Sequence, residues 1–395
     1  DQEAMLRAQT GAVHFFQRPD ADHVAVDSLA ESLSGHGGAV SFGRAGNSKL
    51  RYKNSFHWYS PGLDLNDIGW LQQADVLANS ASVEYSQTDP GKTLRSWSVY
   101  FSQWNNWDFG GLSTSDGTGI SFYGTFNNRW GFRAGFNHLR PYADTRMLRG
   151  GPAFRMPGLI CVSASVSSDA GKPFSARISD HAHFFGGGAS ELHEPSAGFS
   201  WRVADRVSLS ADFSHSRNIQ DLQYAATTAD AASGAPVYVL GRIDQKTLSA
   251  TCRLNWYATP DLSVQFYGSP FVSTGRYSHY KRVLSPLAVS EGKRYRTIGK
   301  DEIGKSGETG AWQAAEAGGP EYAFANPDFS FREFRSNLVV RWEYRPGSVL
   351  YAVWSQGRTS WTSDWERSVT ENIDALSSAA AENVFLLKAS YWFTL

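Results

Sequence analysis

Hydrophobic and polar residues alternate along most of the chain with a period of two, as in a β-strand with two different faces. In residues 197–203 apolar side chains occupy the odd positions, whereas glycine, serine and arginine occupy the even ones. The pattern continues over 207–214 after a short turn, and it recurs on both sides of the turn at 127–129. Strands joined in this way form antiparallel hairpins, so the alternation predicts an all-β chain of successive hairpins.

The alternation and the turn residues between its segments predict fifteen strands, and a sixteenth within 3–17 would place both ends of the chain on the same side of the sheet. The fifteen ranges are 38–44, 48–58, 76–86, 93–104, 118–127, 129–138, 156–167, 173–184, 195–204, 206–218, 236–257, 260–270, 333–344, 348–356 and 384–395. The last of them places Phe385, Leu387, Ala389, Tyr391, Phe393 and Leu395 on one face.

Every second connection is short, as at 45–47, 127–129 and 345–347, whereas most of the others are longer. Short turns at one end of the strands and long loops at the other are typical of bacterial outer-membrane barrels, with the long loops outside the cell. The stretch 271–332 is too long for an ordinary hairpin connection, so we expect a lid or an insert into the lumen there.

Composition narrows the class of protein. The 395 residues include 37 Lys and Arg against 38 Asp and Glu, and this balance argues against a nucleic-acid-binding protein. Two Cys exclude a disulfide scaffold and a multi-cysteine metal site. No apolar run is long enough for a membrane helix. Yet 14% of the residues are aromatic, although only 41% are hydrophobic.

Two architectures fit antiparallel hairpins of this kind: a soluble sandwich of two sheets and a transmembrane barrel. The predicted apolar faces end in Trp, Tyr or Phe, as in the aromatic girdles of a barrel, and the opposite faces are small and polar, as in a wet lumen. In lipid every backbone polar group needs a partner within the protein, so such a sheet must close. We therefore predict one domain over 1–395, a transmembrane antiparallel β-barrel of about sixteen strands with long extracellular loops.

If the apolar residues face lipid, the lumen wall carries more basic than acidic side chains. The basic residues are Lys49, Arg51, Lys53, Arg133, Arg177, Arg202, Arg253, Arg341 and Lys388. The acidic residues are Glu84, Asp212 and Glu343. One interpretation is a wall that favours anionic solutes or an acidic plug, and the other is a wall cross-linked by ion pairs and hydrogen bonds. The two interpretations are compatible.

Basic and aromatic residues are also mixed in the stretch 271–286. They form either a solvated loop or an aromatic belt at the membrane interface, or else a surface that binds sugar, lipopolysaccharide phosphate or a partner. These candidates are Arg276, Tyr277, His279, Tyr280, Lys281 and Arg282.

Signals for metal binding or catalysis are weak. Asp64, Asn66 and Asp67 offer three oxygen donors in one loop, but their spacing fits no EF-hand, so calcium is only a minor alternative. His181 and His183 lie on one face of a predicted strand without a third ligand at useful spacing. There is no Gly-x-Ser-x-Gly motif, and nothing singles out a catalytic carboxylate pair. We therefore expect no enzyme and no cofactor, with an outer-membrane hydrolase as a minor alternative.

Several stretches resemble an uncharacterised outer-membrane barrel family of Gram-negative bacteria, in which a family-nine carbohydrate-binding module usually precedes a C-terminal domain of unknown function. The resemblance covers most of the chain. It lies in QRPDADHVAVDSLAESLSGHG (17–37), SPGLDLNDIGWLQQAD (60–75), LRGGPAFRMPG (148–158), QFYGSPFVSTGRYSHYKRVLSP (265–286), NPDFSFREFRSNLVVRWEYRPGSVLYAVWSQ (326–356) and LLKASYWFTL (386–395). The module and much of the preceding barrel segment are absent, so we expect a longer protein or a partner chain to supply further strands.

These observations lead to two functional hypotheses for a protein of the bacterial outer membrane, in contact with lipid and lipopolysaccharide. The first is a channel or transport component for small polar or anionic solutes, with saccharides suggested by the family's companion module. The second is a plugged barrel that anchors, displays or exports a surface carbohydrate-binding module or a partner protein.

Overall fold

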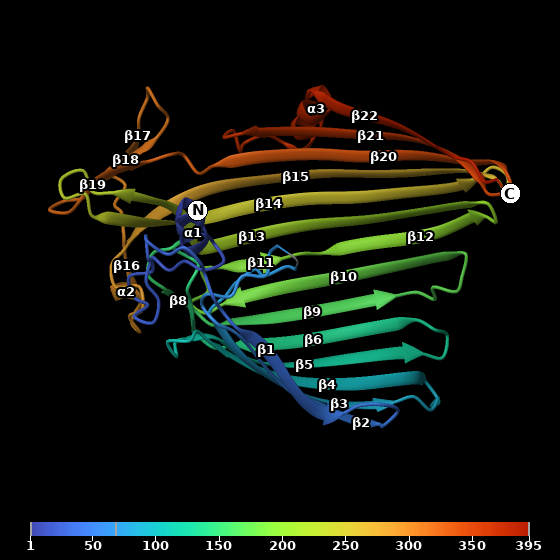
Figure 1. Cartoon of the computed structure of the whole chain (residues 1–395), viewed down its shortest axis with the longest axis horizontal. Coiled ribbons are helices and arrows are strands. Elements are labelled where there is room, and N and C mark those ends of the chain that lie inside the picture. The colour runs from blue at the N-terminus through green and yellow to red at the C-terminus, as the bar shows by residue number, and fades with distance from the viewer. Residues whose placement is uncertain (1, 68, 394–395) are drawn as a thin grey trace.

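The computed structural model describes residues 2–67 and 69–393, and most of them form one antiparallel sheet (Figure 1). In this sheet each long strand pairs with the long strand before it and the one after it in the chain. The long strands are β1 (Gly37–Arg44), β2 (Leu50–Tyr59), β3 (Val76–Gln87), β4 (Leu94–Trp107), β5 (Ser113–Phe126), β6 (Gly131–Leu139), β9 (Leu159–Ser167), β10 (Phe174–Phe185), β12 (Ser196–Ala204), β13 (Val207–Ala229), β14 (Pro236–Tyr257), β15 (Leu262–Val283), β20 (Phe329–Arg345), β21 (Ser348–Thr362) and β22 (Ala381–Ser390).

The remaining elements are short and lie mainly towards the ends of these strands. The short strands are β7 (Tyr142–Asp144), β8 (Phe154–Met156), β11 (Glu191–His193), β16 (Tyr295–Thr297), β17 (Ile303–Lys305), β18 (Trp312–Ala315) and β19 (Glu321–Phe324). The helices are α1 (Gln2–Thr10), α2 (Glu291–Arg294) and α3 (Val369–Ser378). None of the helices in the described part of the chain is long and apolar enough to cross a membrane.

Each of the fifteen predicted strands coincides with one long strand, so the all-β prediction is confirmed. The sixteenth strand, expected within 3–17, is wrong. Residues 2–10 form α1, because they lack β-branched side chains before Thr10 and contain good helix formers such as Ala4, Met5 and Leu6. Glu3 and Arg7 add an ion pair one helical turn apart at 3.6 Å. At the other end of the chain, the predicted outward position of Leu395 falls outside the described residues.

The turns at one end of the sheet are tight, as the sequence predicts. Gly46 and Gly347 adopt φ of +90° and +77° in the turns after β1 and β20, a conformation that glycine adopts without a steric penalty. At the opposite end, which we call the loop end, β13, β14 and β15 reach 23, 22 and 22 residues. The bounds of β14 are those predicted, whereas β13 and β15 continue well beyond their predicted limits. At about 3.3 Å per residue, such strands are roughly 70 Å long, more than twice the hydrocarbon thickness of a bilayer.

The two faces of the sheet have opposite chemistry. Val83, Phe101, Ile120, Phe136 and Val162 follow one another across β3, β4, β5, β6 and β9 in a single row. All five side chains are exposed, between 41% and 49%. The neighbouring row on the other face is Ser82, Ser102, Gly119, Asn137 and Cys161. The alternation in the sequence therefore separates an exposed apolar face from a polar face.

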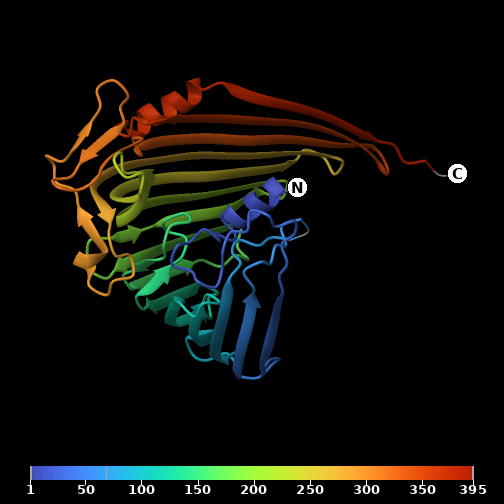
Figure 2. The same ribbon diagram turned by 60° about the vertical axis from the view of Figure 1, so that its left-hand side comes forward.

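The curvature of the sheet puts the polar face on the inside of an arch, which we call the concave face, and the apolar face on the outside (Figure 2). No second sheet of comparable size packs on either face in the described residues. The soluble sandwich considered from the sequence is therefore wrong. The clusters of buried apolar side chains lie instead at the loop end, one around Leu148, Phe154 and Leu240, the other around Val239, Tyr280 and Tyr322.

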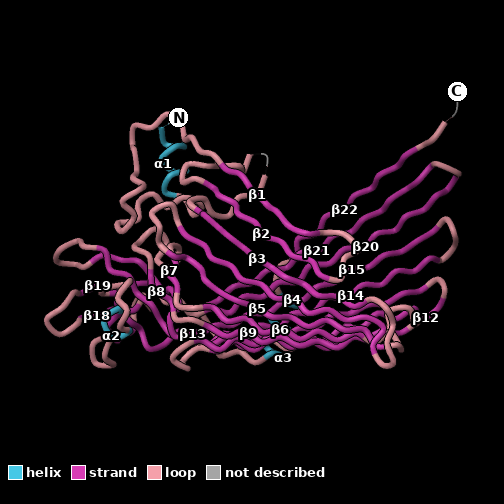
Figure 3. Tube along the Cα trace, turned by 90° about the horizontal axis from the view of Figure 1, so that it is seen from below, coloured by secondary structure: helices cyan, strands magenta, loops and turns pink. Residues whose placement is uncertain are grey.

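The sheet described here is open. Within residues 2–67 and 69–393, β1 pairs only with β2 and β22 only with β21, so one edge of each terminal strand is unpaired. The tube view shows β1 and β22 as the two rims of the curved sheet (Figure 3). The structure thus establishes a large antiparallel sheet but not the closed barrel of about sixteen strands that the sequence predicts.

The predicted insert at 271–332 begins later than expected, because β15 continues to Val283. Residues 284–328 then form α2, β16 and the three-stranded sheet of β17, β18 and β19. This small sheet is held at the loop end by a cluster of ion pairs. Glu316 is nearly completely buried and receives hydrogen bonds from Arg282 at 2.8 and 3.0 Å and from Arg296 at 3.0 Å. Arg296 also binds Glu302 at 2.6 Å.

The Glu302 carboxylate predicts a specific pH dependence for this insert. Hydrogen bonds from Arg296 and from the backbone N–H groups of Gly299 and Ala317 lower the pKa of Glu302 to about 2. A carboxyl group whose pKa falls on folding stabilises the fold above its ordinary pKa of 4.5, and this contribution is lost as the pH falls through about 2. We expect Glu302→Gln to accelerate amide hydrogen exchange across 303–324 at pH 7, and the difference from the wild type to vanish near pH 2. Glu308→Gln, at an exposed position of the same insert, is the control. An equal difference at both pH values would contradict the assignment.

Candidate functional site

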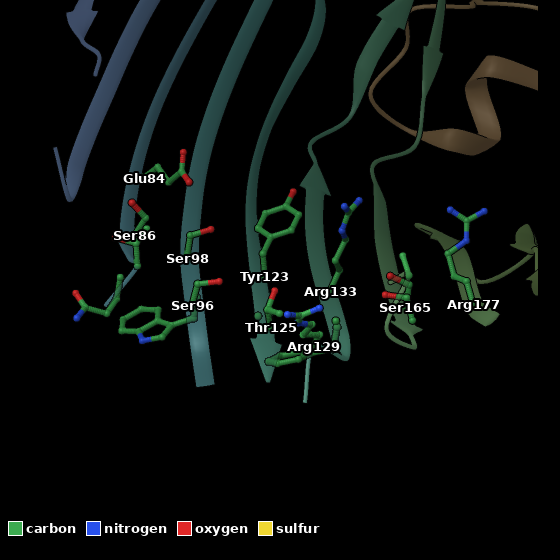
Figure 4. Close-up of a pocket in the computed structure, with 18 of the residues that line it drawn as sticks. Glu84, Ser86, Ser96, Ser98, Tyr123, Thr125, Arg129, Arg133, Ser165 and Arg177 are labelled. Atoms are coloured by element: carbon green, nitrogen blue, oxygen red, sulfur yellow. The ribbon is translucent and has the colours of Figure 1, made fainter. Parts of the chain in front are cut away.

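The concave face contains a polar cavity of about 720 Å³ near the tight turns, formed by neighbouring strands from β2 to β10 (Figure 4). The inward positions at its centre form one row, in which Ser86, Ser98, Tyr123, Arg133 and Ser165 follow one another across β3, β4, β5, β6 and β9. Serine side chains are short, so they leave open space in front of the sheet. The tyrosine and the arginine project into this space from the middle of the row.

The charged groups of the cavity are arranged in pairs and stacks. Arg51 donates a hydrogen bond to Glu84 at 2.7 Å, and the guanidinium of Arg133 lies over the ring of Tyr123 at 5.6 Å. Arg177 is a further basic residue of the cavity, and its guanidinium lies 3.7 Å from the carboxylate of Asp212. Because arginine stays protonated at any physiological pH, the cavity is permanently polar and contains cationic groups.

A second cavity of about 580 Å³ adjoins the first and shares Tyr123, Arg133, Ser165 and Ser179 with it. Its further lining includes His181 and His183, whose Nε2 atoms lie 2.6 Å apart. The row of His181 lies one step farther from the turns than the row of Arg133. The two cavities therefore form one continuous polar groove along the strands, which we call the wall groove.

The register places the predicted inward residues on the concave face. Arg51, Glu84, Arg133 and Arg177 line the wall groove together. The rest are distributed around the sheet. Lys53 lies opposite Ser82, Arg202 opposite Ser208, Arg253 opposite Tyr267, and Lys388 in a row with Tyr351 and Arg341. Lys49 lies just before β2 and pairs with Asp89 at 2.8 Å.

Each of the three inward acids predicted from the sequence has an inward arginine beside it. Besides the Glu84 and Asp212 pairs, Arg341 binds Glu343 at 2.8 Å. Ion pairs therefore do cross-link the wall, as one of the two interpretations predicts. Five basic residues have no carboxylate within 4.0 Å among the described residues, namely Lys53, Arg133, Arg202, Arg253 and Lys388. These five give the concave face its unneutralised positive charge.

The basic and aromatic stretch predicted as a binding loop is instead the outer end of β15. Tyr280 and Lys281 are buried, and the Lys281 ammonium donates to Asp221 at 3.1 Å. Arg282 binds Glu316 in the insert, and Arg276 stacks on Trp365 at 4.6 Å. The prediction of a solvated loop is wrong, because long-range packing of the insert and of residues 363–368 occupies most of these side chains. Tyr277 is half-buried, and His279 remains exposed.

The weak calcium candidate forms local turns. Asp64 Oδ1 accepts hydrogen bonds from the backbone N–H and side-chain amide of Asn66, at 2.9 and 3.0 Å. Asn66 Oδ1 accepts from the backbone N–H of Leu71 at 2.9 Å, and Asp67 is exposed. Such bonds are the ordinary turn chemistry of Asx residues.

The sequence interpretation missed the N-terminal segment, residues 11–36, which crosses the loop end on the concave side (Figures 1 and 2). Arg18 fixes it there. This arginine is 6% exposed, and its guanidinium lies 3.1 Å from Asp20, 3.5 Å from Asp108 and 3.9 Å from Asp75. Asp108 directly follows β4, and Asp75 directly precedes β3. The sequence does show an aspartate at the loop end of two neighbouring strands, Asp75 and Asp108. Nothing in the sequence, however, indicates that these two positions contact residue 18.

Comparison with known proteins adds a family and a distant structural likeness. Residues 17–394 match the model of a family described as a domain of unknown function, DUF5916. No curated protein matches the chain. Among solved structures, the NanC porin in a rhombohedral crystal form is similar, with 9% identity and a TM-score of 0.22 over 80% of this chain and 99% of the porin chain.

The buried contacts of Arg18 predict how firmly the N-terminal segment is docked. Arg18→Met leaves three carboxylates without their guanidinium, and removing one partner from a buried ion pair costs about 3–5 kcal/mol. We expect rapid chymotryptic cleavage at Phe15 and Phe16 in this variant and protection in the wild type. Arg7→Met is the matched control, because the Arg7–Glu3 side chains are 71% and 73% exposed and such surface pairs contribute about 0–1 kcal/mol. Equal cleavage of both variants would refute the anchoring role.

Proposed function

The chain belongs to the DUF5916 family, a domain of unknown function, and from its geometry we propose that it is an outer-membrane β-barrel that conducts small polar solutes with a preference for anions. One observation carries this proposal: the outer face of a very large sheet is apolar and exposed, while its inner face is polar and hollowed by the wall groove.

The apolar face is too extensive to stay in water. Covering one large apolar side chain is worth about 1.5–3 kcal/mol, and exposed apolar side chains extend across the sheet from Phe42 on β1 to Phe385 on β22, which are 67% and 75% exposed. Contiguous apolar surface of this kind marks contact with a membrane or a protein. A hydrocarbon environment fits all strands at once, because the apolar positions recur on every strand of the sheet.

Aromatic side chains support the same environment at the turn end. Exposed tryptophans lie close to four of the tight connections, at Trp130 before β6, Trp201 in β12, Trp256 in β14 and Trp342 in β20. Tryptophan is enriched where membrane hydrocarbon meets water, since its ring is apolar and its N–H needs a polar partner. The four residues would form the periplasmic aromatic girdle of the barrel.

The free edges of β1 and β22 have to be paired in a membrane. An unpaired backbone N–H or C=O costs several kilocalories per mole in hydrocarbon, so only closed sheets span it. The proposed barrel is therefore completed by strands that pair with these two edges. The wall groove then faces the lumen, where unneutralised Arg133, Arg202 and Arg253 attract anions.

A second candidate function rests on the N-terminal segment. It crosses the loop end, anchored by Arg18, and would obstruct the lumen from that side. In this alternative the barrel is plugged and serves as an anchor or export partner for a surface module, including a carbohydrate-binding one. Planar-bilayer recordings separate the two functions: single-channel conductance of the wild type supports the first, whereas conductance that arises only in Arg18→Met supports the second.

The membrane environment can be tested at two adjacent residues of β5 that point to opposite faces. Ile120→Lys places a charge on the apolar face near the middle of the strand, where Lys or Arg costs about 2–4 kcal/mol in a bilayer. Ser121→Lys places the same charge on the polar face and should change stability by less than about 0.5 kcal/mol. Urea unfolding in phospholipid vesicles, followed by tryptophan fluorescence, measures both. If the apolar face were in water, Ile120→Lys would not be destabilising.

The charge of the wall predicts ion selectivity. Arg133→Glu and Arg177→Glu each reverse a cation in the wall groove, so the chloride-to-potassium permeability ratio should fall about threefold or more in each variant, since fixed charges set the local ion concentration. Arg206→Glu reverses an exposed arginine in the tight turn after β12 and serves as the control. Reversal potentials in a salt gradient give the ratio. An open pore whose ratio is unchanged in both groove variants would exclude the wall groove as the solute path.

A further inference from the structure

A third polar cavity, of about 350 Å³, lies between the N-terminal segment and the loop ends, away from the wall groove. Asp20, His23, Asp108 and Gly110 are among the residues that line it. In the described residues, His23, Asp75 and Asp108 form the one group whose nitrogen and carboxylate oxygen atoms lie within 4.8 Å of one another. These residues belong to three segments that are far apart in the sequence.

Asp75 fixes the orientation of the histidine ring. Its Oδ2 lies 2.8 Å from His23 Nε2, and its Oδ1 accepts a hydrogen bond from the backbone N–H of Phe109 at 2.8 Å. An Nε2–H that donates to a carboxylate leaves the lone pair of Nδ1 free to bind a metal. Metal-binding histidines in proteins usually have this second-sphere carboxylate.

The free nitrogen and an Asp108 oxygen border the same space. A Cβ placed on Gly110 would lie 2.6 Å from His23 Nδ1 and 3.3 Å from Asp108 Oδ1. Only glycine keeps this space open. Asp108 is 2% exposed, and its Oδ1 also accepts from the backbone N–H of Leu112 at 2.8 Å, which holds the carboxylate in position.

A buried oxygen without a partner and an excess of carboxylates make this cavity suitable for a cation. Asp20 lines the same cavity, and its Oδ1 is buried without a hydrogen-bond partner, although its Oδ2 binds Arg18 and the backbone N–H of Ala153. The carboxylates of Asp20, Asp75 and Asp108 face one guanidinium, that of Arg18, and the imidazole of His23 lies 2.8 Å from Asp75. Buried carboxylates are costly unless cations or hydrogen bonds compensate them, and a divalent cation would balance this cluster.

We propose that this cavity binds one divalent transition-metal ion, of the class represented by Zn²⁺, through His23 Nδ1 and Asp108 Oδ1, with Asp75 as the second-sphere partner of His23. An imidazole ligand favours Zn²⁺ over Ca²⁺ and Mg²⁺, which prefer oxygen ligands. Because the ligands come from the N-terminal segment and from the β4–β5 loop, the metal ties this segment to the sheet.

The test is a Zn²⁺ titration of the full chain in detergent, in competition with a chromogenic chelator. His181→Ala and His183→Ala are introduced first, since that exposed pair would itself bind Zn²⁺. We expect one Zn²⁺ per chain, and at least tenfold weaker binding after His23→Gln, Asp108→Asn or Gly110→Ala. Asp22→Asn, at the exposed rim of the cavity, is the matched control and should leave affinity within twofold.

Two further readouts keep the proposal open to refutation if a variant misfolds. Co²⁺ bound to the otherwise wild-type cavity should give visible ligand-field bands that disappear in His23→Gln, and Zn²⁺ should slow chymotryptic cleavage at Phe15 and Phe16. No binding of Zn²⁺, binding that is unchanged in all three cavity variants, or tighter binding of Ca²⁺ than of Zn²⁺ would overturn the proposal. Bilayer conductance is measured separately, so this outcome leaves the channel proposal untouched.

Discussion

The exposed apolar face of one very large sheet is the constraint on which the rest of the structure depends. In a soluble protein such a face would be covered by a second layer, and the covered side chains would form the core. Here Val83, Phe101 and Ile120 remain exposed in mid-sheet, while the buried apolar clusters lie at the loop end. The sheet is therefore held by backbone pairing along its strands, and the environment of its outer face is the question that the proposed membrane location answers.

At the loop end, buried ion clusters hold the N-terminal segment and the insert in place. There the strands extend beyond the region that a bilayer would cover in the proposed barrel, and the segments at this end are joined to them through buried ion clusters. Arg18 joins three aspartates beneath the N-terminal segment, and Glu316 joins Arg282 and Arg296 beneath the insert. Buried ion pairs of this kind add less to stability than to specificity of position, because desolvation offsets much of their attraction. They fix where the two covering segments sit.

The sequence was sufficient for the parts of the fold that depend on local periodicity. Strict alternation located every long strand, and short turn motifs such as 345–347 located the tight end. Periodicity failed where a segment is stabilised by distant partners. From periodicity, β15 was predicted to end at 270. The alternation becomes mixed beyond that point, because Tyr280 and Arg282 pack against the insert that follows β15 in the chain. It also predicted a strand within 3–17, where helix-forming residues and the contacts of His14 with Leu63 decide otherwise.

The candidate sites also differ in whether local sequence patterns or distant contacts determine them. Inward positions on the wall follow from register alone, so Arg51, Arg133 and Arg177 could be chosen from the sequence. The cluster around Arg18 joins residues up to 90 positions apart, and no local pattern identifies it.

The positions of these sites along the strands have a consequence for function. The wall groove lies towards the turn end, whereas the anchored segments and the proposed metal lie at the loop end. A solute that entered from the turn end would meet small, fixed polar side chains first and the docked N-terminal segment last. In the proposed channel, control over passage would therefore belong to the loop end, where the ion clusters hold that segment in place.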